Sequence, residues 1–254
     1  MTLQFEGLVG SEPARCGQTY TGIGTTGTDL RLGDFRMYVH DVRLVTEDGR
    51  ELPIALAQDQ AWQVGDVAML DFEDHSADCA MGTDGTSTTV RGTVTEPGPY
   101  RGVRLRLGVP FELNHDDAST APAPLSYSTM FWGWNGGYKY LRVDAYSTGQ
   151  PEGLVVHLGA TGCEGDRRGN ITGCTQDNRA EIALDGFDPT ADRIAVDLGA
   201  LLSQSDLDTD AGGPATCMSG FDDPDCEAVF HAVGLPFAGR APAGPQRFMR
   251  VLSR

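Results

Sequence analysis

Apolar and polar residues alternate with a period of two along much of the chain, which is typical of half-buried β-strands. In the segment 103–109, valine or leucine occupies every second position, and arginine or glycine stands between them. The segment 34–45 alternates in the same way. Its two faces carry Phe35, Met37 and Val39 on one side and Arg36, Tyr38 and His40 on the other. Each segment therefore predicts a strand with one face turned toward an apolar core.

Further alternating segments predict more strands of similar length. They span residues 62–70, 88–94, 138–146, 153–159, 180–184 and 193–197. Glycine and proline, 33 and 14 residues respectively, cluster between these segments and favour tight turns. Evenly spaced strands joined by turns predict an all-β fold, an antiparallel β-sandwich with long loops, formed by the whole chain 1–254 as one domain. The segment 11–30 is expected to be a loop within it.

Helix signals are few. Asp223 and Pro224 have the character of an N-cap and a first helical residue, and predict a helix that continues toward Leu235. A second short helix is expected over residues 198–205.

The charge balance narrows the class of partner. The chain has 254 residues with 36 acids and 19 bases, a net charge of −17. Nucleic acid and anionic membranes would repel such a chain, whereas small cations and basic proteins remain possible partners. No apolar run reaches the ~18 residues of a membrane span. The first residues have neither a basic nor an apolar leader region, so an exported form is expected to have lost its signal peptide.

The six cysteines fall into pairs by their spacing. Cys163 and Cys174 flank ten residues, Cys217 and Cys226 flank eight, and Cys16 and Cys79 remain as a third pair. No CxxC motif occurs. We therefore expect disulfides and an oxidising compartment, either the periplasm or the exterior.

The segment 128–142, STMFWGWNGGYKYLR, holds two of the three tryptophans. In an extended chain Trp132 and Trp134 would point to the same face. Three interpretations fit: an aromatic core cluster, a platform on which sugar rings stack, and a redox-active aromatic pair.

Motifs for common catalytic sites are absent from the sequence. GxSxG, GxGxxG, a P-loop and HExxH do not occur, which disfavours an ordinary hydrolase or nucleotide-dependent enzyme. Only five histidines are present, so a metal site would have to be assembled from distant strands. Acidic stretches at 71–74, 205–213 and 221–226 offer oxygen ligands for calcium, although the stretch 205–213 lacks the closing glutamate of an EF-hand.

Several segments in this order resemble the MbnP family, also described as the four-Cys member of a "metallo-mystery pair". They are DFRMYVHDVRLV (34–45), LGVPFELNH (107–115), APAPLSYSTMFWGWNGGYKYLRVD (121–144), HLGATGC (157–163) and CMSGFDDPDC (217–226). The resemblance runs from about Cys16 to Leu235, and the MFWxWxxGYK block is its most specific part. It implies a periplasmic copper-binding protein of copper homeostasis, encoded beside a dihaem partner, MbnH, of the cytochrome c peroxidase/MauG superfamily. MopE and CorA of methanotrophs are functionally similar.

The resemblance also implies that Trp132 is oxidised to kynurenine before copper binds. An intact indole offers only an N–H donor, whereas the opened ring exposes an amine with a lone pair. Cu(I) accepts such a nitrogen together with imidazoles. The chain would then be the protein substrate of the dihaem partner and not itself an enzyme, with Trp134 as a candidate electron relay.

The histidines that match family motifs are His40, His115 and His157, and which two of them complete the site stays open. His75 and His231 match no motif. Met130 is expected to pack in the core. The alternative functions are a secreted β-sandwich that binds carbohydrate or calcium, and a purely structural surface domain.

Overall fold

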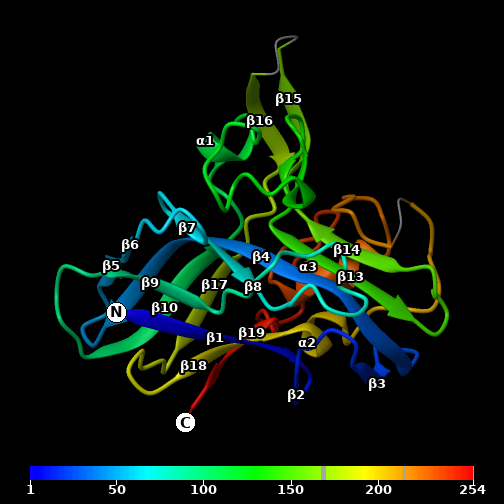
Figure 1. Ribbon diagram of the computed structural model, residues 1–254, viewed down its shortest axis with the longest axis horizontal. Helices are drawn as coiled ribbons and strands as arrows, with labels where there is room; N and C mark the ends of the chain where they lie inside the picture. The colour runs from blue at the N-terminus through cyan, green and yellow to red at the C-terminus, as the bar shows by residue number, and fades with distance from the viewer. Residues whose placement is uncertain (167–169, 214–215, 254) are drawn as a thin grey trace.

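Two β-sheets face each other in the computed structural model, which describes residues 1–166, 170–213 and 216–253 (Figure 1). Within these residues the smaller sheet has six strands, paired in the order β19 (Met249–Leu252), β18 (Arg193–Asp197), β1 (Thr2–Val9), β9 (Thr89–Thr93) and β6 (Ala55–Leu56), with β2 (Glu12–Pro13) beside β1. The order of the larger sheet is β14 (Leu154–Leu158), β13 (Leu141–Ser147), β4 (Thr28–Thr46), β10 (Tyr100–Leu107) and β17 (Glu181–Asp185). Three further strands pair with β4: β3 (Thr19–Ile23), β5 (Glu51–Pro53) and β8 (Val67–Asp71). The short strand β7 (Gln63–Val64) pairs with β8.

The shorter elements lie outside these sheets. Two hairpins pair β11 (Phe131–Gly133) with β12 (Gly137–Tyr138), and β15 (Thr161–Gly165) with β16 (Ile171–Gln176). The helices are α1 (Phe111–Asn114), α2 (Leu198–Leu202) and α3 (Cys226–Ala232), and a 3₁₀ turn spans Ser128–Met130. Figure 1 shows the β15/β16 hairpin and α1 projecting together from the body.

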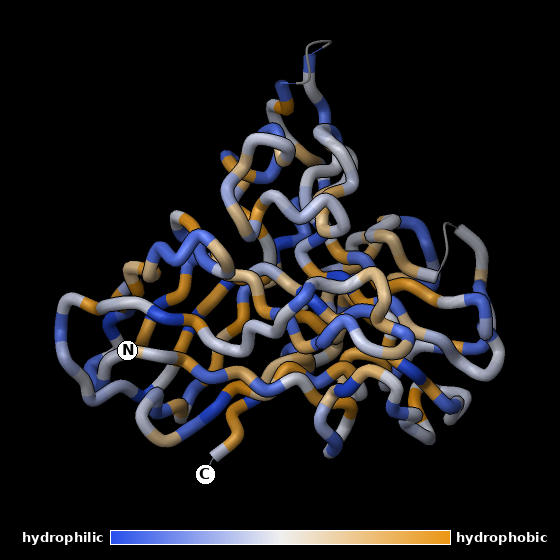
Figure 2. Tube along the Cα trace, viewed as in Figure 1, coloured by the Kyte–Doolittle hydropathy of each residue, from blue (hydrophilic) through white to orange (hydrophobic). Residues whose placement is uncertain are grey.

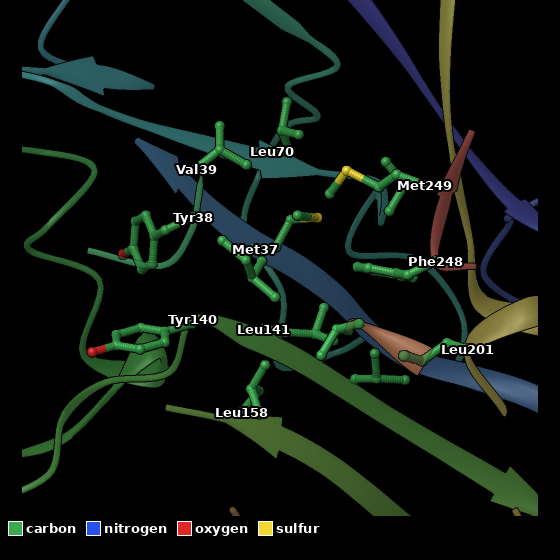
Figure 3. Packing of buried hydrophobic residues seen from close by; sticks show 14 of the residues in the cluster. Met37, Tyr38, Val39, Leu70, Tyr140, Leu141, Leu158, Leu201, Phe248 and Met249 are labelled. Atoms are coloured by element: carbon green, nitrogen blue, oxygen red, sulfur yellow. The ribbon is translucent and has the colours of Figure 1, made fainter. Parts of the chain in front are cut away.

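The apolar core fills the space between the two sheets. Met37 and Val39 of β4 are fully buried there, together with Leu141 of β13 and Phe248 and Met249 beside the smaller sheet (Figure 3). Hydrophobic stretches of the chain concentrate in the strands, while the projecting hairpin is mostly hydrophilic (Figure 2). The period-two alternation of β4 therefore does place one face in the core, as predicted.

The predicted fold class is confirmed, with local differences. Each predicted strand segment contains a strand, although the segments 62–70 and 138–146 are each divided in two. β1 and β18 pair in parallel, an exception to the antiparallel pattern. The segment 11–30, expected to be a loop, instead contains β2, β3 and the first residues of β4, and Tyr20 of β3 is buried where it pairs with Leu30 of β4.

The two predicted helices are present but shorter than expected. Asp223 accepts a hydrogen bond from the Asp225 N–H at 3.1 Å, as an N-cap would. The regular helix nevertheless begins only at Cys226, after an intervening turn closed by the Cys226 N–H on the Asp223 carbonyl.

All six cysteines are disulfide-bonded in the expected pairs, Cys16–Cys79, Cys163–Cys174 and Cys217–Cys226. Within the described residues, no helix has both the length and the apolar character needed to cross a membrane.

Candidate metal centre

Trp132 lies in the short β11/β12 hairpin, which glycines shape. Gly133 has a φ of +146° and Gly137 a φ of +74°, values that side-chain-bearing residues rarely adopt. The hairpin is tied to α1, because Asn114 accepts a hydrogen bond from the Tyr138 N–H at 3.0 Å. The hairpin thereby holds Trp132 at the edge of the larger sheet.

The indole of Trp132 packs directly on backbone. A Cβ atom at Gly159 would lie 2.5 Å from Cζ3 of Trp132, so only glycine leaves room for the ring there. The indole Nε1 is buried and has no hydrogen-bond partner within the described part of the chain. The ring also lines a cavity of about 300 Å³, beside Cys163 and Met218. A buried N–H without an acceptor is uncommon in folded proteins and calls for an explanation.

The two neighbouring tryptophans do not share a face, contrary to the expectation for an extended segment. Trp134 is 54% exposed and lines a different, larger groove of about 700 Å³, together with Phe131 and His115. The positive φ of Gly133 between the tryptophans breaks the alternation that an extended strand would impose.

His115 follows α1 and contacts the tryptophan hairpin. Its Nδ1 donates to the carbonyl oxygen of Trp134 at 3.0 Å, which leaves the lone pair on Nε2. This Nε2 faces the side-chain amide of Asn114 at 3.1 Å and Sγ of Cys174 at 3.5 Å. Burial lowers the pKa of His115, so the imidazole is neutral at pH 7. The Cys163–Cys174 disulfide therefore lies between His115 and the cavity beside Trp132.

His157, on β14, has the hydrogen-bonding pattern of a metal-ligating histidine. Its Nε2 donates to Oδ1 of Asp144 at 2.6 Å, and its Nδ1 is buried without a partner among the described residues. Burial lowers the pKa of His157 despite the opposing effect of Asp144. A carboxylate that fixes one ring nitrogen and orients the other is the usual support of a metal-bound imidazole.

His40, on β4, is buried and also neutral. Its Nδ1 donates to the carbonyl oxygen of Gly108 at 2.9 Å, so Nε2 carries the lone pair. Burial lowers its pKa to about 4. The charge of Arg179 lowers the pKa of both His40 and His115, which places both imidazoles within its electrostatic range.

The sheet register separates His40 from His157. His157 pairs with Arg142, which pairs with Arg36, four residues before His40 on β4. At ~3.3 Å per residue and ~4.8 Å per strand, the two Cα atoms are about 16 Å apart. Two imidazoles cannot reach one ion across that distance. Of the three candidate histidines, a pair that shares one ion must therefore include His115.

Within the described residues, no two of these histidines join a third histidine, cysteine or carboxylate in one compact group. The compact groups of such side chains are His115 with Cys163 and Cys174, and Glu73 with Cys16 and Cys79. Among these residue types, the described structure therefore offers no third ligand to any pair of the candidate histidines.

A buried charged network lies on the face of the larger sheet turned away from the core, and sequence reasoning missed it. Asp34, Arg36, Asp71 and Glu73 are all almost fully buried. Arg36 donates to Asp34 at 2.8 Å, and burial raises the pKa of Asp71 to about 8. The network reaches His157, because Arg142 lies 3.2 Å from Asp34 and also pairs with Asp144, the partner of His157. Period-two alternation marked Arg36 only as a residue facing away from the core.

The remaining candidates have structural partners. His75 pairs with Asp84 at 2.7 Å on the surface, and His231 contacts the carbonyl oxygen of Arg240. Met130 is fully buried in the core, as expected.

Two of the three acidic stretches proposed for calcium, 205–213 and 221–226, come together. The Ala211 N–H donates to Asp225 at 2.9 Å, and Gly213 lies against Asp223. Calcium binding at this position stays a prediction.

The fold and this site define a class: a disulfide-linked β-sandwich in which neutral histidines and a buried tryptophan line one end of a sheet. The MbnP family model matches residues 1–219, and the chain belongs to the MbnP family. The solved structure of MbnP from Methylosinus trichosporium is similar, with 30% sequence identity and a TM-score of 0.85 over 99% of this chain and 97% of that one. A search among curated proteins found no match.

Proposed function

We propose that this chain is a copper-binding protein whose site is completed when Trp132 is oxidised to kynurenine. Membership of the MbnP family supports a role in the methanobactin copper system. The observation that carries the proposal is that Nε1 of Trp132 is buried without a hydrogen-bond partner among the described residues, in a residue that also lines a cavity. This nitrogen becomes the aromatic amine when the five-membered ring is opened.

Residue 132 is unable to bind a metal until its ring is cleaved. An indole nitrogen carries a hydrogen and offers no free lone pair. Cleavage of the C2–C3 bond adds two oxygen atoms and removes four electrons, which gives N-formylkynurenine. Hydrolysis then releases formate and leaves the amine. The oxidant in this proposal is a dihaem partner of the MauG class, and the chain is its substrate and not itself an enzyme.

Copper in this proposal is held by the amine of residue 132, His115 and one further histidine. His115 is common to every pair that the sheet register allows. The buried, unpartnered Nδ1 supports His157, and the shared influence of Arg179 on the pKa of His115 supports His40. Neutral imidazoles and an aromatic amine suit Cu(I), which accepts low coordination numbers.

The proposed location is the periplasm. Six cysteines in three disulfides fit an oxidising compartment. The net charge of −17 would favour a partner that presents a basic surface.

The test compares copper content after co-production with the dihaem partner. The wild type should retain one copper per chain, and Trp132→Phe should retain none, because phenylalanine keeps apolar volume but cannot yield an amine. His115→Gln should lose copper as well, whereas the surface variant His75→Gln serves as a matched control and should keep it. His40→Gln and His157→Gln then identify the second imidazole. Full copper retention by Trp132→Phe would contradict kynurenine ligation.

Carbohydrate binding remains a second candidate because of one observation. The exposed Trp134 lines a groove of about 700 Å³ with Asp116 and Asp117, which resembles a stacking platform with polar groups at its rim. Sugar binding that is lost in Trp134→Ala and is independent of copper would favour this function.

A further inference from the structure

A second cluster of soft metal ligands lies beside the candidate copper centre and involves no tryptophan. Nε2 of His115 lies 3.5 Å from Sγ of Cys174, and the ligand atoms of His115, Cys163 and Cys174 all lie within 4.8 Å of one another. The lone pair of His115 is on this nitrogen, because Nδ1 donates to the Trp134 carbonyl. It accepts a hydrogen bond from the side-chain amide of Asn114 at 3.1 Å, which metal binding would replace. While the cysteines are bonded to each other, the cluster offers one imidazole and no thiolate.

This is the one disulfide of the three whose two cysteines are both partly exposed. Cys163 and Cys174 are both half-buried, and Cys163 lines the cavity of about 300 Å³ beside Trp132. By contrast, Cys217 and Cys226 are fully buried, and in the remaining pair Cys79 is fully buried while Cys16 is half-buried. A small dithiol can therefore approach Cys163–Cys174 from either cysteine, whereas Cys16–Cys79 can be approached from Cys16 alone.

The hairpin that carries the disulfide lies outside both main sheets, and Cys163 and Cys174 pack only against the edge of the core cluster. β15 and β16 pair with each other, and in the described chain they form a two-stranded sheet separate from both main sheets. Figure 1 shows this hairpin projecting away from the sandwich. Reduction is therefore compatible with an intact fold.

We propose that reduction of Cys163–Cys174 creates a second copper site, in which the two thiolates and Nε2 of His115 bind Cu(I). A dithiol reductant supplies two electrons and two protons: its own sulfurs form a disulfide, the Cys163–Cys174 bond breaks, and two thiols result. Binding of Cu(I) then releases the thiol protons. Thiolate and imidazole ligands select a soft ion such as Cu(I), and the thioether of Met218 lines the same cavity.

The reduced site and the kynurenine site share His115 but have different requirements. The reduced site needs the thiolates of the two cysteines, and it does not depend on whether Trp132 is intact or oxidised. The kynurenine site needs oxidation of Trp132 and no free thiol. The inference therefore does not rest on the proposed function, and Trp132→Phe separates the two.

The experiment uses the full chain produced without a dihaem partner, so that Trp132 is unmodified. The protein is treated with dithiothreitol under anaerobic conditions, and the thiols are located by alkylation and peptide mass mapping. After removal of the reductant, Cu(I) is titrated in competition with a coloured chelator. We expect the first two thiols at Cys163 and Cys174 and one tightly bound Cu(I) per chain in the reduced protein only.

The variants test the ligand set. Trp132→Phe should bind Cu(I) as the wild type does after reduction. His115→Gln should weaken binding at least ~10-fold, in the range typical of perturbed metal sites, and His75→Gln should not. The double variant Cys163→Ser, Cys174→Ser should show no gain of copper on reduction.

A second measurement covers the case in which the double variant does not fold. The X-ray absorption spectrum of copper in the reduced wild type should contain sulfur neighbours. Equal Cu(I) binding before and after reduction, first thiols at other cysteines, or a copper ion with nitrogen neighbours alone would each overturn the inference.

Discussion

The two faces of β4 are built from alternate residues of the same strand, yet they differ in kind. One face buries Phe35, Met37 and Val39 in the apolar core. The other buries Arg36, which pairs with the carboxylate of Asp34, and His40, which donates to the backbone carbonyl of Gly108. The apolar face stabilises the sandwich, whereas the polar face leads through Arg142 and Asp144 to His157 and the tryptophan hairpin. The extent of burial therefore does not distinguish the apolar core from the candidate metal centre in this molecule. What distinguishes them is whether the buried side chains contact apolar or polar groups.

Removal of Arg36 should give the largest loss of stability. Arg36→Ala leaves Asp34 and Glu73 as buried carboxylates without their main cation, and such losses cost about 3–5 kcal/mol. Arg106→Ala breaks only exposed ion pairs and should cost less than about 1 kcal/mol. Urea unfolding measures both. If the two variants lost similar amounts of unfolding free energy, the ion pairs of Arg36 would contribute no more to stability than exposed ion pairs do.

Truncation on the apolar face should cost somewhat less and leave the metal site intact. Met37→Ala opens a cavity in the core and should lower the free energy of unfolding by about 3 kcal/mol. The control Met37→Leu conserves volume and should cost less than about 1.5 kcal/mol. Copper content of co-produced protein should equal that of the wild type in both. A loss of copper in folded Met37→Ala would contradict the division between the faces.

The neutral state of His40 should make stability depend on pH. Its folded-state pKa is about 4, against an ordinary value of 6.5, so the unfolded chain binds the additional proton between these values. Stability is then complete above pH 6.5 and falls as the pH drops toward 4, by up to about 3 kcal/mol. The difference between the unfolding curves of the wild type and His40→Gln isolates this contribution. Parallel pH profiles would mean that His40 takes up a proton equally in both states.

Replacement of Trp134 should have the smallest effect on stability. Its side chain is 54% exposed, so Trp134→Phe should change the free energy of unfolding by less than about 0.5 kcal/mol. If Trp134 relays electrons from Trp132, the rate at which the dihaem partner converts Trp132 should fall. Time-resolved peptide mass spectrometry measures that rate, and an unchanged rate would exclude the relay.

The sequence predicts one face of β4 much better than the other. Alternating apolar residues indicate a strand with one face in the core, because Phe35, Met37 and Val39 stand at every second position and so lie on the same face. Arg36 carries no comparable signal, since a polar residue in the same position is normally solvent-exposed. Its burial depends on Asp34, Glu73 and a loop that folds over the strand, contacts that no local pattern encodes.

The candidate site was predictable in its parts but not in its arrangement. Motifs marked Trp132 and the three histidines, and cysteine spacing gave the disulfide pairs. The packing of Trp132 on Gly159, the contact of His115 with Cys174 and the separation of His40 from His157 follow from strand register and loop positions. These are long-range features, and short sequence windows do not contain them.

The most direct test of the account is one mass measurement on the peptide that contains Trp132, combined with the copper content of the same sample. In protein matured by the dihaem partner, this peptide should lose one carbon atom and gain one oxygen atom, and the chain should carry copper. Copper held by chains whose residue 132 is still an intact indole, with all three disulfides closed, would contradict it.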